Sequence, residues 1–177
     1  MGYPVFNVGE VLTANDMNAV GLWLIKTQTI GSGVSSVTVS DVFSADFDVY
    51  RITISSGVGS ATSVLQLSLG STGTGYYYGG KARTYAGADL NVQGANQANW
   101  YAGESNVNAH TFDVILTNPY LAKNTLISAM IAPARTDGYS LFVSGYLANT
   151  TSYTAFTITP NTGTITGGTI RVYGYRN

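Results

Sequence analysis

Apolar and polar residues alternate with a period of two along most of the chain, which is the pattern of half-buried β-strands. The alternation is clearest in three early segments, residues 34–39, 48–55 and 63–69. It returns in five later segments, which are residues 111–117, 125–132, 139–147, 153–159 and 169–175. Turn-forming Gly, Pro, Asn and Asp residues separate the segments. The pattern predicts an all-β fold, an antiparallel, jelly-roll-like β-sandwich of about ten strands.

The C-terminal strands carry finer predictions. Ile170, Val172 and Gly174 share one face of the last strand, and a strand at a terminus stays ordered only when it is paired. We therefore expect this strand to lie inside a sheet or against a partner subunit. The stretch TITGGTIRV, residues 164–172, predicts two strands joined in a tight hairpin by a Gly-Gly turn.

One short segment near the N-terminus has a helical pattern instead. Thr13 can cap a helix, and Asp16 follows three residues later as a variant of the capping box. Met17, Val20 and Leu24 then recur at helical spacing. We expect one short helix here. It either packs on its own domain or docks on another protein, and both interpretations stay open.

The change of period at Lys26 divides the chain into two parts. We expect residues 1–25 to form an N-terminal segment with the short helix, and residues 26–177 to form a β-sandwich domain. We expect no membrane insertion, because no run approaches the roughly 20 apolar residues of a membrane helix. The N-terminus also lacks the basic and apolar regions of a signal peptide.

Charge and cysteine content exclude several classes of function. Charged residues make up 10% of the chain, the net charge is −1, and there is no cysteine. We therefore expect no nucleic-acid partner, since that requires a basic surface. Disulfides, zinc–thiolate sites and cysteine nucleophiles are excluded. So few charges favour a chain that buries part of its surface in an oligomer.

Candidate catalytic chemistry is sparse. His110 is the single histidine and is expected to be structural or at the surface. Asp46 and Asp48 share a strand face and could begin a carboxylate or calcium site, but no third oxygen ligand is evident, which favours a solvated strand end. The sequence predicts no catalytic residue, no metal site and no cofactor.

Residues 74–108 break the alternation with a stretch rich in Gly, Asn, Gln, Tyr and Trp. We expect short strands around residues 76–78 and near Trp100, with exposed loops between them. Aromatic rings can stack on sugars, and hydroxyl and amide groups can bind sugar hydroxyls. The candidate glycan or receptor contacts are Tyr76, Tyr78, Tyr85, Trp100 and Tyr101. The alternative is that several of them fill the core or a subunit interface.

Three segments resemble one group of proteins. FNVGEVLTANDMNAVG, residues 6–21, resembles an N-terminal motif of structural proteins of tailed bacteriophages. FTITPNTGTITGGTIRVYGYRN, residues 156–177, is similar to the C-terminal end of many phage virion proteins of unassigned role. DVFSADFDVYRITISS, residues 41–56, also fits that group. Together they cover about a third of the chain, and their occurrence in this order is more specific than any one of them.

The resemblance implies a non-enzymatic virion protein made in the host cytoplasm. It implies a short homotrimeric tail fibre or receptor-binding protein, whose N-terminal segment docks on other virion proteins and whose β-rich domain contacts the host surface, with a glycan as a candidate ligand. The candidate docking residues are Phe6, Val11, Leu12, Met17, Val20 and Leu24. The chain departs from long fibres because it has no coiled-coil heptads and no repeated shaft. A capsid decoration or head-fibre protein is therefore the alternative, and a polysaccharide-degrading enzyme ranks last.

Overall fold

The computed structural model of the protein describes Gly9 and residues 21–175, in which there are fourteen strands and no helix. No membrane-crossing helix is therefore found in this part of the chain. An eight-stranded antiparallel sheet, here called the front sheet, has the order β1 (Leu22–Thr29), β14 (Thr169–Tyr175), β3 (Val49–Ser55), β9 (His110–Thr117), β10 (Leu126–Ile131), β11 (Tyr139–Leu147), β6 (Tyr76–Thr84) and β7 (Asp89–Gln97). The all-β prediction is confirmed.

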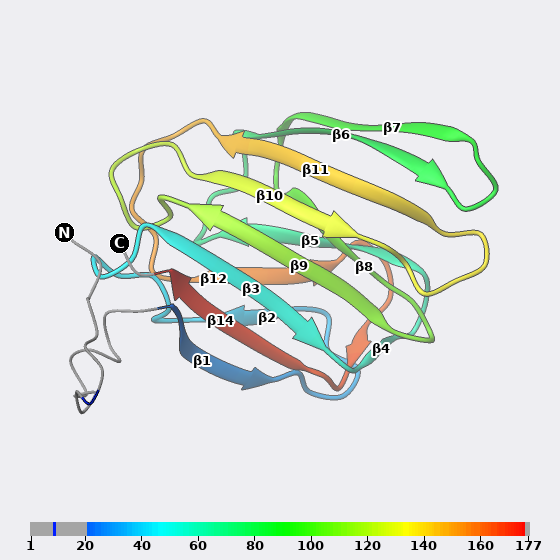
Figure 1. The fold of residues 1–177 in the computed structure, drawn as a ribbon, viewed down its shortest axis with the longest axis horizontal. Coiled ribbons are helices and arrows are strands. Elements are labelled where there is room, and N and C mark those ends of the chain that lie inside the picture. Colours follow the sequence, from blue (N-terminus) through cyan, green and yellow to red (C-terminus); the bar gives the residue numbers. More distant parts are fainter. Residues whose placement is uncertain (1–8, 10–20, 176–177) are drawn as a thin grey trace.

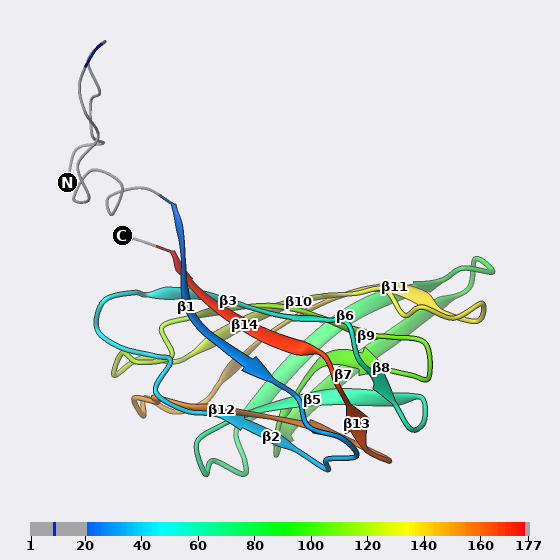
Figure 2. The same cartoon turned by 90° about the horizontal axis from the view of Figure 1, so that it is seen from below.

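A smaller sheet, the back sheet, has the order β2 (Val37–Val39), β12 (Phe156–Pro160), β5 (Ser63–Leu69) and β8 (Trp100–Ser105). The front sheet lies over it as a second layer (Figures 1 and 2). Strand β9 joins the layers, because its first residues pair with β8 while its later residues pair with β3 and β10. Two short strands, β4 (Val58–Gly59) and β13 (Ile165–Thr166), form a separate pair.

The core fills the space between the two sheets, and the alternation of the sequence builds it. Leu65, Leu67 and Leu69 of β5 are fully buried, as their shared face predicts. Val64 of the same strand points to the other face and is half-buried. Ile52 of β3 faces them from the front sheet and is also fully buried. Each such side chain stabilises the fold by about 1.5–3 kcal/mol relative to an exposed position.

The last strand is paired on both sides, so the prediction that it lies inside a sheet is confirmed. Strand β14 lies between β1 and β3, and Ile170 and Val172 are fully buried. The predicted Gly-Gly hairpin is wrong. Gly167 and Gly168 both have positive φ and do turn the chain, but β13 pairs with β4 instead of β14. Burial of Ile165, which is bridged to Val34, draws β13 away from the front sheet.

The predicted loops of residues 74–108 are also wrong over much of their length. Strands β6 and β7, nine residues each, form a hairpin at the edge of the front sheet, and β8 belongs to the back sheet. These strands need few aliphatic side chains, because β6 is held by backbone pairing to β11 along its whole length. A bulge next to Tyr76, with Asn96 at φ 52°, bends the hairpin.

The predicted N-terminal helix lies mainly outside the described residues, and so do the docking candidates Phe6, Val11, Leu12, Met17 and Val20. Its last predicted position, Leu24, is described, and the helical assignment there is wrong. Leu24 lies in β1 opposite Tyr173, and the strand begins at Leu22, four residues before the expected change of period. Pairing with β14 supplies backbone hydrogen bonds that outweigh the weak helical spacing.

Candidate functional site

The outer face of the front sheet, turned away from the back sheet, carries its side chains in rows. Residues directly opposite on neighbouring antiparallel strands point the same way, so the register aligns them across the strands. One row runs through Gly79, Ser144, Ser128, Ile115 and Arg51, on β6, β11, β10, β9 and β3. The first three have no side chain or a small one. The middle of this face is therefore low.

Larger side chains stand on both sides of this row. On one side Tyr77, Tyr146 and Leu126 are opposite one another, with Tyr146 42% and Leu126 47% exposed. The Tyr77 and Tyr146 rings are stacked, with centroids 5.2 Å apart. On the other side Phe142 and Met130 are opposite one another and are 54% and 67% exposed. A low row between two raised rows is a trough.

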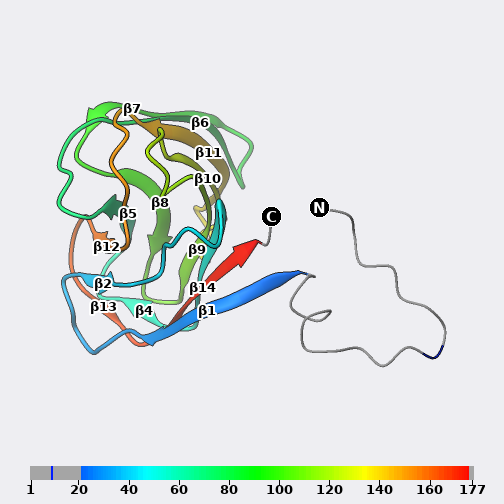
Figure 3. The same ribbon diagram turned by 90° about the vertical axis from the view of Figure 1, so that its left-hand side faces the viewer.

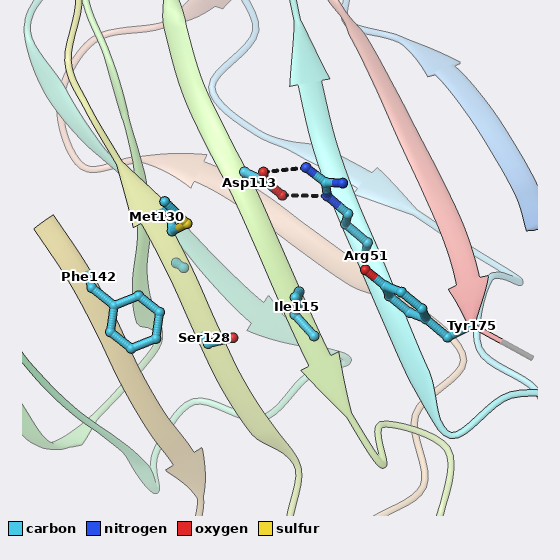
Figure 4. Close-up of a pocket in the computed structure, with 8 residues that line it drawn as sticks. Arg51, Asp113, Ile115, Ser128, Met130, Phe142 and Tyr175 are labelled. Carbon is cyan, nitrogen blue, oxygen red and sulfur yellow. Dashed lines mark hydrogen bonds and ion pairs between the residues drawn. The ribbon is translucent and has the colours of Figure 1, made fainter. Parts of the chain in front are cut away.

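Two hollows lie along this trough. One, of about 190 Å³, is lined by Ser128, Met130, Phe142 and the Arg51–Asp113 pair, together with Ile115, Ala129 and Tyr175. Figure 4 labels seven of these side chains, on β3, β9, β10, β11 and β14, and Ala129 contributes from the buried side of β10. The other, of about 310 Å³, is lined by Ser144 and Tyr146, together with Tyr77, Tyr78, Gly79, Gly94 and Gly145. Ser128 and Ser144 are direct partners across β10 and β11, so the two hollows adjoin.

The Arg51–Asp113 pair is a two-pronged ion pair at one end of the trough (Figure 4). Arg51 Nε donates to Asp113 Oδ1 at 2.8 Å, and Nη2 donates to Oδ2 at 2.6 Å. The hydrogen bond to Asp113 raises the pKa of Arg51. Both side chains are about 40% exposed (40% and 38%), so their outer polar atoms stay accessible while their charges cancel.

Two of the predicted ligand contacts, Tyr76 and Trp100, belong to the core. Both side chains are fully buried and pack edge to face, with centroids 4.8 Å apart. The Tyr76 hydroxyl accepts from Leu69 N at 2.8 Å and donates to Thr72 O at 3.2 Å. Burial raises the pKa of Tyr76 to about 12. The packing alternative therefore holds for these two residues, because neither ring reaches the surface.

The other three candidates are scattered. Tyr78 is half-buried against the core and borders the second hollow. Tyr85 is 53% exposed, and its hydroxyl donates to Pro133 O at 3.2 Å, next to the β10–β11 connection. Tyr101 is half-buried, with its hydroxyl against that of Tyr139. Only Tyr78 of the predicted contacts therefore lies beside the trough.

The contacts predicted from the sequence do not include Tyr146, Phe142 or Met130. A signal for two of them is present in β11, where Phe142 and Tyr146 alternate with the buried Leu141, Val143 and Leu147. Large apolar residues therefore occupy both faces of this strand, whereas a solvated outer face is normally polar. Contiguous exposed apolar side chains mark interaction sites more often than ordinary surface does.

A charged network around the buried Glu104 lies away from the trough. Glu104 accepts from Arg135 Nε at 2.8 Å and from the Tyr139 hydroxyl at 2.5 Å. The Arg135 guanidinium also lies over the Tyr139 ring, and Asp137 pairs with it at 2.7 Å. Burial, followed by the hydrogen bond to Glu104, raises the pKa of Tyr139. The network fixes the β10–β11 connection to β8. The Glu104 side chain is 4% exposed, so little room is left beside its carboxylate for a substrate.

His110 is buried beside Ser105, with Nδ1 and Oγ 2.8 Å apart. Its Nε2 has no hydrogen-bond partner among residues 21–175. Ser105 is fully buried, so this pair is closed to a substrate and His110 has the structural role that was expected of it. Asp46 is exposed and bonded to Ser44, and the described residues contain no group of three His, Cys, Asp or Glu side chains that could hold a metal ion.

Burial lowers the pKa of His110 below its ordinary value of 6.5. Between the two values the unfolded chain binds the proton and the folded chain does not, so stability falls as the pH drops through about 6.5. We expect urea unfolding of the wild-type protein to show this loss between pH 7 and pH 5. His110→Gln should reduce the dependence of the free energy of unfolding on pH in this range, since the chain has one histidine. Equal slopes for the two proteins would contradict the prediction.

The chain was also compared with protein-family models, with curated proteins and with solved structures. None of the three comparisons found a match.

Proposed function

We propose that the protein is a non-enzymatic virion structural protein of a tailed bacteriophage. In this proposal it is a short homotrimeric tail fibre or receptor-binding protein, docked on the particle by its N-terminal segment and contacting the host through the β-sandwich. The three sequence segments that resemble phage virion proteins support the virion assignment. The observation that carries the contact function is the exposed, largely apolar outer face of the front sheet around Phe142 and Met130.

The strand order supports a jelly-roll type of sandwich. Strands β1, β14, β3 and β9 are neighbours in the front sheet, and β2, β12, β5 and β8 are neighbours in the back sheet. Along the chain these eight strands pass between the sheets as they do in a jelly roll, which has eight strands in two sheets. The hairpins β6–β7 and β10–β11 are then additions that widen the front sheet and create the outer face with the trough.

The β1 edge is the surface that favours assembly. Leu22 and Leu24 are 42% and 54% exposed, and within the described residues β1 pairs on one side alone, with β14. An exposed strand edge with apolar side chains pairs readily with another chain. Figure 3 shows β1 and β7 on opposite sides of the molecule. In a trimer built along the β1 edge, the additional hairpins point away from the shared axis.

Deleting residues 1–20 tests the docking role and leaves β1 intact, since β1 begins at Leu22. We expect the shortened protein to fold and to keep its oligomeric state, but to be absent from purified particles. Circular dichroism and light scattering measure the first two properties, and immunoblotting of particles measures the third. Particles that contain the shortened protein in normal amount would contradict the docking proposal.

Capsid decoration remains the second candidate, because an apolar face of this kind also suits the cementing of capsid subunits. Antibody–gold labelling of particles separates the two. Label at the tail end supports the receptor-binding proposal. Label spread over the head, together with capsids that lose heat stability without the protein, supports decoration.

A further inference from the structure

We propose that the trough binds a linear, uncharged oligosaccharide. The inference deepens the proposed function, because it rests on the β-sandwich being the part that contacts the host. It assigns the contact to a defined set of residues on the outer face of the front sheet, which includes one of the five aromatic residues that the sequence analysis selected.

The floor of the trough is open and can form hydrogen bonds. A Cβ atom added to Gly79 would meet no atom within 4 Å, so nothing fills the space above this residue. Ser144 is exposed and Ser128 half-buried, and the structure records no side-chain hydrogen bond from either to residues 21–175. Two hydroxyl groups are thus available to a ligand, each able to donate and to accept.

The walls suit the apolar faces of sugar rings. Phe142 and Tyr146 are four residues apart on β11, about 13 Å along the strand at 3.3–3.4 Å per residue. Their side chains therefore stand on either side of the position of Ser144, with room for one chain of rings between them. Aromatic side chains supply a rigid apolar face, and tyrosine adds a polar tip. This combination fits a ligand that is apolar above and below and polar at its edges.

The length of the trough favours a chain of several sugars over one small molecule. Its centre row crosses five neighbouring strands, with the low floor on β6, β11 and β10 and the larger Ile115 and Arg51 on β9 and β3. With strands about 4.8 Å apart, the centre row extends over roughly 19 Å. At one end of the row, Gly145 allows β11 to lie close to β6, because a Cβ atom at this position would lie 2.1 Å from Tyr77 O on β6.

The charges favour a neutral ligand. Arg51 and Asp113, the charged residues that line the hollows, neutralise each other. Arg51 uses Nε and Nη2 for the pair, which leaves Nη1 as a further donor, and each carboxylate oxygen of Asp113 can accept more than one hydrogen bond. A planar pair of this kind can bind adjacent sugar hydroxyls. Lys81 is opposite Phe142 in the register but lines neither hollow.

Saturation-transfer NMR with the full chain tests the inference. The probes are maltohexaose, cellohexaose, mannohexaose and the hexamer of N-acetylglucosamine. We expect at least one of them to receive saturation and to bind with a measurable Kd. If none of the four receives saturation at millimolar concentration, the inference is overturned.

Variants then locate the binding. Gly79→Val fills the floor where space is free and suits a strand, so the protein should fold while the Kd rises about tenfold or more. Phe142→Ala removes one wall and should weaken binding as well. Ser68→Val, on the other side of the molecule in β5, is the control and should leave the Kd unchanged. An unchanged Kd in Gly79→Val would overturn the site.

Analytical sedimentation of the same variants tests whether a second copy of the chain occupies the trough, because it measures their oligomeric state. If Phe142→Ala or Gly79→Val dissociates the oligomer, the trough is an interface between copies and the inference is overturned. Failure of the sugar-binding inference is distinct from failure of the virion proposal, because the virion proposal is tested by incorporation of the protein into particles. Incorporation that still requires residues 1–20, with no sugar bound in the trough, would overturn the sugar site alone.

Discussion

Trp100→Ala is expected to lower the free energy of unfolding by about 3–5 kcal/mol, the range for removing a large aromatic side chain from a packed core. Trp100 is fully buried in β8 and packs edge to face on Tyr76, so both rings lose contacts. The indole Nε1 has no hydrogen-bond partner among residues 21–175, so the loss comes from packing and the cavity. The melting temperature should fall by roughly 10 °C.

Urea denaturation at neutral pH measures this change, and Phe142→Ala is its matched control. Phe142 is also a large aromatic residue on a strand, but it is 54% exposed, so its removal should cost about 1 kcal/mol or less. A Trp100→Ala protein with unchanged stability and lost adsorption to the host would contradict the core assignment. It would instead place Trp100 in contact with a ligand.

Arg135→Ala should be comparably destabilising, by about 3–5 kcal/mol, because it leaves a buried carboxylate without its cation. The Glu104 side chain is 4% exposed, and Arg135 donates to both of its oxygens. The Tyr139 hydroxyl remains as a donor but carries no charge. Adding Glu104→Gln to Arg135→Ala removes the uncompensated charge and should recover part of the loss.

The control for this experiment is Arg83→Ala. Arg83 pairs with Asp89 at 2.9 Å, but these side chains are 67% and 68% exposed, and an exposed pair contributes about 0–1 kcal/mol. Chemical denaturation of the three variants gives the comparison. Equal losses for Arg135→Ala and Arg83→Ala would show that the buried network stabilises the fold no more than an exposed ion pair does.

The strands that the sequence predicts well are those with one clear apolar face. Residues 63–69 and 139–147 match β5 and β11 residue for residue, because burial between two sheets imposes the period of two. The sequence does not predict the β6–β7 hairpin. This hairpin lies at a sheet edge and is held by backbone pairing, which imposes no alternation of apolar and polar side chains. The Gly-Gly sequence correctly predicts a turn. It does not predict that β13, before the turn, pairs with the distant β4.

The trough could not be predicted for a related reason. Its rows exist because Gly79, Ser144 and Ser128 are aligned by strand register, and register is a property of pairs of strands far apart in the sequence. The link between Glu104 and Arg135 is similarly set by the fold. Single-residue chemistry drew attention to Tyr76 and Trp100, whose burial is decided by the same long-range packing.

The position of β14 determines when the protein can fold during its synthesis. Within the described residues β1 pairs with β14 alone, and β3 has β14 on one side. Strand β1 leaves the ribosome before the other described strands, so it must wait for the segment ending at Tyr175 before it finds its partner. A nascent chain that stops before Thr169 exposes two unpaired strand edges, which makes it prone to aggregation and a substrate for chaperones or proteases. Closure of the front sheet is thus a late event, and incomplete chains are kept out of the folded population.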